Sequence, residues 1–136
     1  MKIKPHISLA KATNKSPDLL TNIIIRNFQI DSDEPIDRGG QNLAPTPFDL
    51  LNSALVSCTS IYLRVISNKN NINTGTIMIK IKISLQEDKS LLFDRTITIE
   101  KEITKEEREF LLEQSNFSPT TIILKKCNTI NTTLIN

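Results

Sequence analysis

Cys58 is the side chain of this sequence best suited to chemistry, because an ionised thiol is a strong nucleophile that can be oxidised reversibly. The chain contains two cysteines, Cys58 and Cys127. A reactive thiol must be ionised and accessible, which requires a positive charge close by. The alternative interpretation is that Cys58 is a small buried hydrophobic residue, since free cysteine is among the most buried residue types. Cys127 is expected to be structural.

Two other kinds of chemistry are disfavoured by the residue types present. His6 is the single histidine, so neither a zinc site nor a Cys–His nucleophile pair is expected. The adjacent glycines Gly39 and Gly40 do not form a phosphate-binding loop after a strand, and they are expected to serve a backbone turn. We therefore expect neither a metal nor a cofactor.

The cation that a reactive Cys58 needs must come from outside its own helix. Arg64 lies six residues further along and points elsewhere. Arg38, in the loop before the helix, is the first candidate, and Arg26, at the end of a predicted strand, is the second. Asp49 lies nine residues before Cys58, about half a turn away in phase, so it cannot touch the thiol along one straight helix. Its role would be indirect, by orienting Arg38, or simply that of a helix cap.

The segment that carries Cys58 has the sequence of an amphipathic helix from residue 47 to about residue 67. Thr46 suits the N-cap, Pro47 suits the first helical position, and Asp49 suits the third, where it completes a capping box. Apolar residues then recur at the spacing of one helical face. They are Leu51, Ala54, Leu55, Cys58, Ile61, Tyr62 and Val65. Cys58 is expected in the middle of this apolar face, on a buried helix.

The remaining segments predict an α+β domain with a largely antiparallel sheet. A second capping box, Thr104 with Glu107, opens a helix, and Ser118-Pro119 opens a short third helix. Strands are expected where apolar and β-branched residues alternate between turn signals. The expected strands are residues 3–10, 19–30, 77–85, 91–99 and 129–135, with a polar break at 14–17 and a hairpin loop at 86–90.

Length, charge and hydropathy restrict the class of protein. A chain of 136 residues fits one domain, and no internal repeat or boundary divides residues 1–136. The net charge of +2 comes from interleaved cations and acids, so there is no basic stripe for nucleic acid. No run approaches roughly 18 apolar residues, and residues 1–15 lack a signal-peptide core, so we expect a cytoplasmic protein without a membrane span. In that reducing compartment both cysteines are expected to be thiols.

Residues 34–51, with the sequence EPIDRGGQNLAPTPFDLL, resemble a signature of the OsmC/Ohr family, the osmotically induced and organic hydroperoxide resistance proteins. That signature has two glycines, a short spacer, a Pro-x-Pro and an acid before a Leu-Leu pair. Residues 54–59, ALVSCT, resemble the cysteine-bearing helix of the family. The order of predicted elements also agrees over nearly the whole chain.

The resemblance implies an intertwined homodimer with the cysteine helix buried and the site at the subunit interface. It also implies a thiol-dependent peroxidase of the oxidative stress response. In that reaction an organic hydroperoxide oxidises a first cysteine to a sulfenic acid, a second cysteine closes a disulfide, and an external thiol reduces it, while an arginine and an acid hold the first cysteine as thiolate. Cys58 matches the first cysteine, Arg38 stands near where some members place the arginine, and Asp49 would orient Arg38.

Two positions depart from the peroxidase pattern. The family's second cysteine typically stands just before a proline at the start of a late helix, and that position here is Ser118. Cys127 is a poor substitute, since a continuous helix would place it about 13 Å along the axis and on the opposite face. Phe48 stands where the peroxidase branch has its acid, and Asp49 follows it.

These departures leave two functions open. The first is the reduction of hydrophobic organic hydroperoxides through Cys58, with an external low-molecular-weight thiol as the resolving agent. The second is a non-catalytic protein that binds a small hydrophobic ligand at the dimer interface. A dimeric structural protein without a ligand is a third, plainer alternative.

Overall fold

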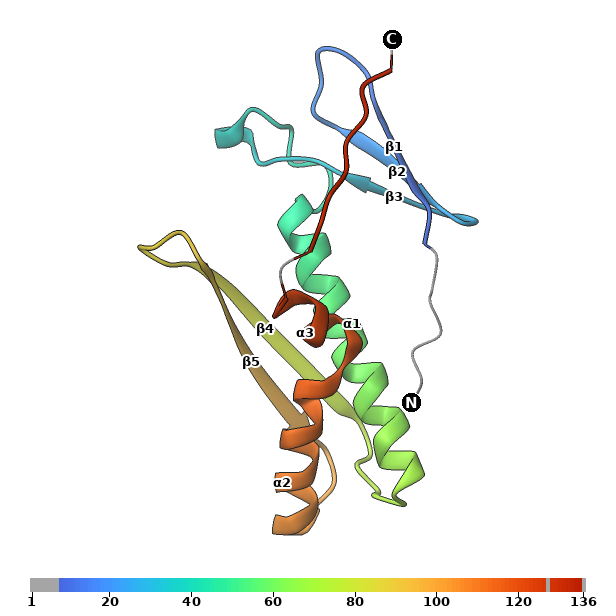
Figure 1. Cartoon of the computed structure of the whole chain (residues 1–136), viewed down its shortest axis with the longest axis vertical. Coiled ribbons are helices and arrows are strands. Elements are labelled where there is room, and N and C mark those ends of the chain that lie inside the picture. Colours follow the sequence, from blue (N-terminus) through green and yellow to red (C-terminus); the bar gives the residue numbers. More distant parts are fainter. Residues whose placement is uncertain (1–7, 127, 136) are drawn as a thin grey trace. The chain divides into compact units, whose positions relative to one another are not determined.

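The computed structural model describes residues 8–126 and 128–135 (Figure 1). Most of the strand predicted at residues 3–10, and Cys127, lie outside the described residues. Backbone packing divides the chain into two compact units, Met1–Ser53 and Ala54–Asn136, and the boundary falls within the long helix α1 (Pro47–Lys69). Each unit has its own sheet.

The first unit contains a three-stranded antiparallel sheet in the order β1-β2-β3. Its strands are β1 (Ala10–Asn14), β2 (Thr21–Ile25) and β3 (Phe28–Ser32). The single strand predicted at 19–30 is therefore wrong, because two strands meet at a tight turn formed by Arg26 and Asn27, with a φ of 54° at Arg26. The sequence did not reveal this turn because it contains neither glycine nor proline, and apolar residues continue on both sides of it. β1 also continues to Asn14, the first residue of the predicted polar break.

A loop after β3 leads to the long helix. It includes one turn of 3-10 helix, η1 (Ile36–Arg38), which ends at Gly39 with a φ of 89°. Gly40 has a different reason to be glycine, because a Cβ atom there would lie 1.8 Å from the carbonyl oxygen of Glu34. The adjacent glycines thus serve a backbone turn, as the sequence predicted.

The second unit contains a two-stranded antiparallel sheet with helices alongside it (Figure 1). Its elements after α1 are β4 (Ile77–Leu85), β5 (Leu91–Ile99), α2 (Lys105–Gln114), the 3-10 turn η2 (Ser115–Phe117) and α3 (Pro119–Leu124). The hairpin and the helices predicted here are confirmed, and the capping box of Thr104 and Glu107 is present. The register places Ile79 opposite Ile97 and Ile81 opposite Arg95.

One face of the β4–β5 hairpin is apolar and packs against α1 and α2. The centre of this core is formed by Leu63 of α1, Leu111 of α2 and Ile72, all nearly fully buried. Each such side chain contributes roughly 1.5–3 kcal/mol when it leaves water. The partly buried residues packed against this centre are Ile66, Ile77, Ile79, Ile97, Ile99, Ile103 and Phe110. The alternation of apolar residues in β4 and β5 therefore predicted the buried face correctly.

Helix α1 begins where its capping box predicted. The backbone N–H and the hydroxyl of Thr46 both donate to Asp49 Oδ2 at 2.9 Å, and the backbone N–H of Asp49 donates to Thr46 Oγ1 at 3.2 Å. These bonds satisfy N–H groups that the first turn of a helix leaves without a partner.

The residues of α1 that face the core differ from the prediction. The fully buried positions are Leu55, Thr59, Leu63 and Ser67. Of the predicted apolar face, Leu55 is buried as expected, but Leu51, Ile61 and Val65 are exposed in the single chain. The apolar spacing did not identify the buried face correctly, because polar side chains, Thr59 above all, occupy part of it.

Residues 128–135, which include the final strand predicted at 129–135, form no strand in the structure. Their β-branched composition favours an extended chain, but they pair with no strand among the described residues. The fold class is the predicted one, an α+β fold with antiparallel sheets and three α-helices in the described residues.

Helix α1 has 23 residues and a mean hydropathy of 1.3 over its most apolar window, which by length and composition alone would suit a membrane span. Core helices of soluble proteins meet the same criteria, and the buried residues of α1 pack within the second unit. The absence of a membrane span stays a prediction from the sequence.

Replacing Gly40 with alanine is expected to destabilise the protein more than replacing Gly39. The new Cβ would collide with the backbone of Glu34, and we expect the free energy of unfolding to fall by on the order of 3 kcal/mol or more. In Gly39→Ala the Cβ meets only Leu19 Cδ1, at 3.8 Å, so the cost is about 1–2 kcal/mol for a left-handed alanine. Urea unfolding of both variants measures the difference. Equal losses would contradict the close approach of Gly40 to Glu34.

Candidate functional site

Cys58 is a free thiol on α1 and is half-buried. Consecutive helical residues point about 100° apart. The next residue, Thr59, therefore faces the core and is fully buried, whereas Cys58 points away from the core. Cys58 lies instead in the middle of an apolar stripe that is largely open in the single chain, with Ile61 64% exposed. We call this stripe the outer stripe of α1. Its members are Leu51, Ala54, Cys58, Ile61 and Val65.

The partners predicted for Cys58 belong to the first unit. Arg38, in η1, is exposed, and its Nη1 lies 3.8 Å from Oε2 of Glu34, its ion-pair partner. The carboxylate of Asp49 accepts hydrogen bonds from Thr46 at the start of α1 and makes no ion pair with Arg38. The structure therefore places Arg38 and Asp49 in one unit without bringing them together. Their roles beside Cys58 stay predictions.

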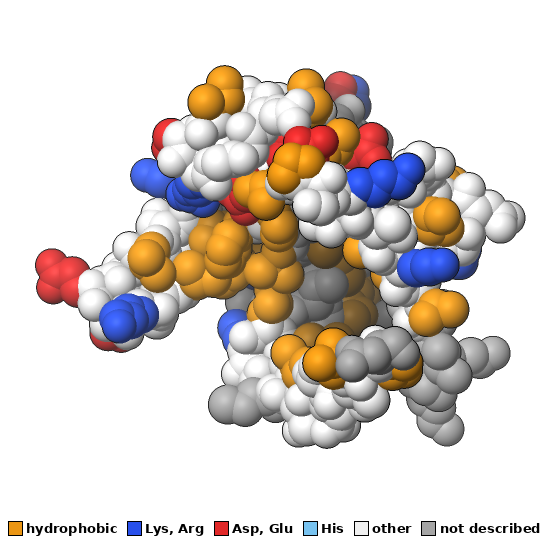
Figure 2. All heavy atoms as spheres, turned by 90° about the horizontal axis from the view of Figure 1, so that it is seen from above, with side chains coloured by type: hydrophobic (Ala, Val, Ile, Leu, Met, Phe, Trp, Pro, Cys, Tyr) orange, Lys and Arg blue, Asp and Glu red, His pale blue; other side chains and the backbone are white. Residues whose placement is uncertain are grey.

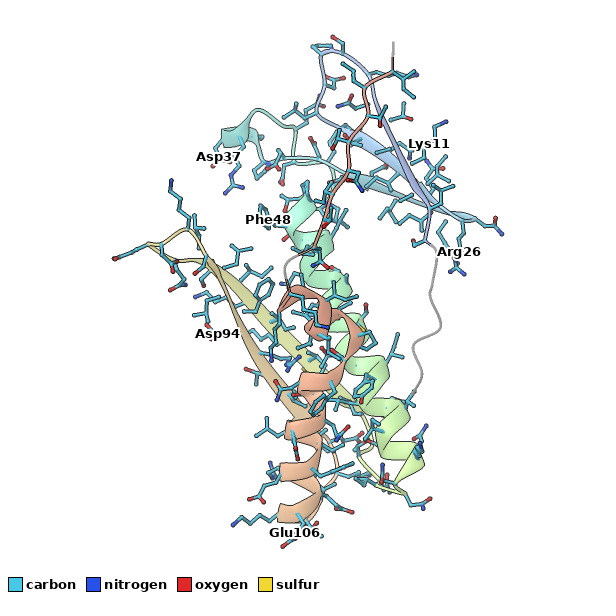
Figure 3. All side chains as sticks on the ribbon, viewed as in Figure 1. Lys11, Arg26, Asp37, Phe48, Asp94 and Glu106 are labelled. Atoms are coloured by element: carbon cyan, nitrogen blue, oxygen red, sulfur yellow. The ribbon has the colours of Figure 1, made fainter. Side chains whose placement is uncertain are left out.

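The second candidate cation, Arg26, is placed at the β2–β3 turn. Its guanidinium carbon lies 5.3 Å from the ring centroid of Phe28, within the range of a cation–π contact. Figure 3 shows Arg26 at this turn and Phe48 projecting from the first turn of α1. Phe48 is 54% exposed.

The loop that carries Arg38 is organised by a buried acid that sequence reasoning missed. Asp33 is 2% exposed, and its carboxylate accepts the backbone N–H groups of Glu34 at 2.8 Å, Gln41 at 3.1 Å and Leu43 at 3.1 Å. Burial by itself raises the pKa of Asp33, but these N–H donors favour the ionised form, and the net result is a pKa below the ordinary value. One carboxylate thus closes residues 34–43 into a fixed loop. No sequence motif distinguishes Asp33 from the acids around it.

Arg95 is a second charged residue that sequence reasoning missed, and it lies in the second unit. It stands on β5 in the same phase as Phe93 and Ile97, on the face of the hairpin that packs against the helices. Its neighbour Asp94 projects from the other side of the hairpin (Figure 3). A signal was available, because the alternation in β5 places a cation at a position where an apolar residue is expected.

The guanidinium of Arg95 donates to hydroxyl groups from three further elements. Nη1 donates to Thr59 of α1 at 3.3 Å and to Thr121 of α3 at 3.0 Å, and Nη2 donates to Ser115 of η2 at 3.0 Å. The hydroxyls of Thr59 and Ser115 donate in turn to backbone carbonyl oxygens of α1 and α2. We call Thr59, Ser115, Thr121 and Ser118 the hydroxyl cluster.

Ser118, at the position of the family's second cysteine, belongs to the hydroxyl cluster. It is fully buried, and its Oγ lies 2.7 Å from Oγ1 of Thr121, where either atom can donate. Ser118 precedes Pro119 at the start of α3, but its side chain makes no capping bond to that helix. Ser118 therefore occupies the N-cap position, while its hydroxyl bonds to Thr121, which also accepts from Arg95.

Arg95 also lines a pocket of about 320 Å³ in the second unit. Its apolar walls are Leu55, Leu91, Phe93 and Leu124, and its polar lining is Arg95, Asn116, Thr121 and Lys125. No carboxylate lines the pocket, and none of the described acids lies within ion-pair distance of Arg95. Burial lowers the pKa of Arg95, but an arginine stays charged near neutral pH. We call this pocket the Arg95 pocket.

The described residues offer one thiol and no metal centre. Within residues 8–126 and 128–135, no group of three His, Cys, Asp or Glu side chains is placed to hold a metal ion. Cys58 is the free cysteine of this part of the chain, and position 118 presents a hydroxyl. The arrangement therefore supports chemistry at a single sulfur.

The chain belongs to the OsmC-like protein family, whose profile matches residues 39–132. Its fold is similar to that of an OsmC-like protein of Mycoplasma pneumoniae, with a TM-score of 0.71, 17% identity, and coverage of 90% of this chain and 89% of the other. An organic hydroperoxide resistance protein, OsmC, of Legionella pneumophila gives a TM-score of 0.68 at 16% identity, covering 90% and 91%. An organic hydroperoxide resistance protein of Elizabethkingia anophelis gives 0.68 at 21% identity, covering 92% and 91%. A search of curated proteins finds no match.

Lowering the pH is expected to release the loop around Asp33. The folded-state pKa of Asp33 is depressed, so its ionised form stabilises the folded protein above about pH 4, and this contribution is lost as the pH falls through the folded-state pKa. Asp33→Asn should remove this part of the pH dependence, whereas Asp31→Asn, at an exposed acid on β3, should retain it. Urea unfolding between about pH 6 and about pH 3 measures both. An unchanged acid dependence in Asp33→Asn would contradict the assignment.

Proposed function

We propose that this protein is a thiol-dependent, peroxidase-type redox protein of the oxidative stress response, which reduces small hydrophobic organic hydroperoxides at Cys58. One observation carries the proposal: an OsmC-like chain keeps a free, half-buried thiol on α1, while the position of the second cysteine is a buried hydroxyl. An external low-molecular-weight thiol would then resolve the oxidised cysteine. A reducing compartment such as the cytoplasm would supply that thiol.

In the first step the Cys58 thiolate attacks the terminal oxygen of the hydroperoxide. The S–O bond forms as the O–O bond breaks, and the alkoxide takes up a proton and leaves as an alcohol, so that Cys58 becomes a sulfenic acid. An external thiol condenses with the sulfenic acid and releases water, which gives a mixed disulfide. A second external thiol attacks this disulfide, frees the Cys58 thiol and leaves as the external disulfide. The sum is one hydroperoxide and two thiols giving one alcohol, one water and one disulfide.

Arg38 is the cation that we propose for the Cys58 thiolate, because a thiolate needs a positive charge nearby. Asp33 and the adjacent glycines Gly39 and Gly40 hold the loop on which Arg38 stands, so the cation has a defined place in the first unit. Asp49 would orient Arg38 while it caps α1. Glu34 already accompanies Arg38 as its ion-pair partner.

The proposed active form is a homodimer. The outer stripe of α1 repeats at alternating steps of three and four residues, the spacing at which helices pack along a seam. Its large members are exposed in the single chain. Apolar side chains, drawn in orange in Figure 2, are open at several places on the surface of the single chain. A partner subunit covering this stripe would enclose Cys58 in apolar surroundings suited to a hydrophobic hydroperoxide.

Stoichiometric oxidation of Cys58 tests the redox function. One equivalent of cumene hydroperoxide should add one oxygen to Cys58, and a small thiol should convert the product to a mixed disulfide, both detected by mass spectrometry. Cys58→Ser should abolish the reaction and Cys127→Ser should not. Arg38→Ala should slow oxidation roughly tenfold or more, the effect of about 1.4 kcal/mol in the barrier. Arg26→Ala, at the second candidate cation, should leave the rate unchanged, and the reverse result would assign the role to Arg26. A Cys58 that stays reduced in excess hydroperoxide would disprove the proposal.

Ser118→Cys separates the redox function from its alternative. If Cys58 is a competent peroxidatic thiol, the introduced thiol should raise turnover with a dithiol reductant above that of the wild type and of Ser118→Ala. An internal disulfide would form only with Cα atoms roughly 4.4–6.8 Å apart. Ser118→Ala controls for the loss of the hydrogen bond to Thr121.

The alternative function is that of a non-catalytic family member that binds a small hydrophobic ligand at the dimer interface. Ser118 and the exposed Phe48 favour it, because they stand where the peroxidase pattern has a cysteine and an acid. Under this alternative Cys58 would resist oxidation in both the wild type and Ser118→Cys. The two functions therefore give opposite results in the same experiment.

Replacing Ile61 with glutamate is expected to disrupt the proposed dimer. Ile61 lies on the outer stripe and is 64% exposed in the single chain, and an uncompensated charge there would cost several kcal/mol in a buried interface. Light scattering should give the mass of two chains for the wild type and of one chain for Ile61→Glu. Ser53→Glu, an exposed position of α1 that points away from the stripe, is the matched control. A wild-type protein that is monomeric at micromolar concentration would rule out the dimer.

A further inference from the structure

Arg95 retains binding capacity beyond its contacts within the chain. A guanidinium has five N–H donors. Three donate to Thr59, Ser115 and Thr121, which leaves two without an acceptor among the described residues. Two is the number of N–H donors that a carboxylate accepts in a bidentate pair.

The guanidinium is also held in place before any ligand arrives. Its three acceptors come from α1, η2 and α3, and Ser118 supports one of them by bonding to Thr121. Binding energy is therefore not used to immobilise a long flexible side chain, which is one of the main costs of association. A planar arginine fixed in this way is better suited to one carboxylate than a mobile lysine would be.

The charge of the Arg95 pocket has no opposite charge beside it among the described residues. Arg95 and Lys125 line it, and no acid is among its lining residues. Partial burial lowers the pKa of Arg95, which shows that its surroundings disfavour the charge. Buried charges are normally paired, so an anion in the pocket would supply the missing opposite charge.

The rest of the pocket is apolar. Leu55, Leu91, Phe93 and Leu124 form its walls around a volume of about 320 Å³. This is near the lower end of small-molecule sites, which span roughly 300–1,000 Å³. An inorganic anion would leave these walls uncovered, and a large lipid would exceed the volume. The chemistry that fits both parts is an anionic head on a short hydrocarbon chain.

We propose that the Arg95 pocket is a binding site for a small aliphatic monocarboxylic acid, whose carboxylate pairs with Arg95 and whose chain lies on Leu55, Leu91 and Phe93. The pocket lies within the second unit, and Cys58 is not among its lining residues. The site is thus separate from the thiol chemistry proposed above and does not depend on it.

Titration calorimetry of the full chain with octanoate tests the proposal. Octanoate has no peroxide group, so its binding is measured independently of any reaction at Cys58. It should bind once per chain. Octanol, which keeps the chain and lacks the charge, and acetate, which keeps the charge and lacks the chain, should each bind at least about tenfold more weakly.

Two arginine variants locate the site. Arg95→Gln should weaken octanoate binding at least about tenfold, and Arg95→Lys should fall between it and the wild type because an ammonium cannot form the fork. Arg108→Gln is the matched control, since Arg108 lines a different pocket of about 240 Å³ beside Ile97 and Leu112. Octanoate binding should be unchanged in Arg108→Gln.

A third variant keeps the test decisive if Arg95→Gln fails to fold. Leu91→Trp fills the pocket from a wall residue that is 37% exposed and leaves the hydrogen bonds of Arg95 in place, so it should abolish octanoate binding in a folded protein. The proposal is overturned by any of four results. They are wild-type affinity in folded Arg95→Gln or Leu91→Trp, equal binding of octanol and octanoate, loss of binding in Arg108→Gln instead, and no saturable binding of octanoate at millimolar concentration.

Discussion

The packing of the second unit depends on the guanidinium of Arg95, which lies on the otherwise apolar face of β5. A charge at this place requires polar partners from every element that covers it, and α1, η2 and α3 supply Thr59, Ser115 and Thr121. Removing the arginine would leave buried hydroxyls without a donor, and removing the hydroxyls would leave a charge poorly solvated. This interdependence explains why Thr59, a polar residue, stands on the buried face of α1.

Each unit contains one charged side chain that is surrounded by neutral hydrogen-bonding groups, and the two charges have opposite signs. In the first unit the carboxylate of Asp33 is surrounded by backbone N–H groups, and in the second unit the guanidinium of Arg95 is surrounded by hydroxyls. Neither ion is neutralised by an opposite charge among the described residues. Neutral dipoles satisfy the hydrogen-bonding groups but leave the net charge in place. Each unit therefore keeps a fixed charge in a partly dry environment, where its field reaches further than it would in water.

Local sequence signals predicted those parts of the fold that local physics determines. The capping boxes at Thr46 and Thr104 form as expected, since their partners lie three residues away on the same turn. The alternation in β4 and β5 identified the buried face of the hairpin because successive side chains of a strand point to opposite faces. The turn at Arg26 and Asn27 escaped because it contains neither glycine nor proline, and the pairing of β2 with β3 imposes the positive φ of Arg26.

The candidate site was less predictable, because its geometry depends on residues far apart in the sequence. Cys58 and Ser118 could be singled out by their position in a family pattern, but the contacts of Ser118 with Thr121 and Arg95 come from separate elements that meet only after folding. Arg95 broke the period of its strand, which was a usable signal. Asp33 gave none, since its partners are backbone groups that every sequence possesses.

The hydroxyl at position 118 has a kinetic consequence for the redox reaction proposed at Cys58. A cysteine there would resolve the oxidised thiol internally, at a rate independent of what surrounds the protein. With serine, the lifetime of the sulfenic acid is set by the local supply of small thiols. A second hydroperoxide molecule then competes for the same sulfur and drives it to a sulfinic acid, which ordinary thiols do not reduce. Such a protein responds to the ratio of peroxide to thiol around it, and it inactivates itself when that ratio stays high.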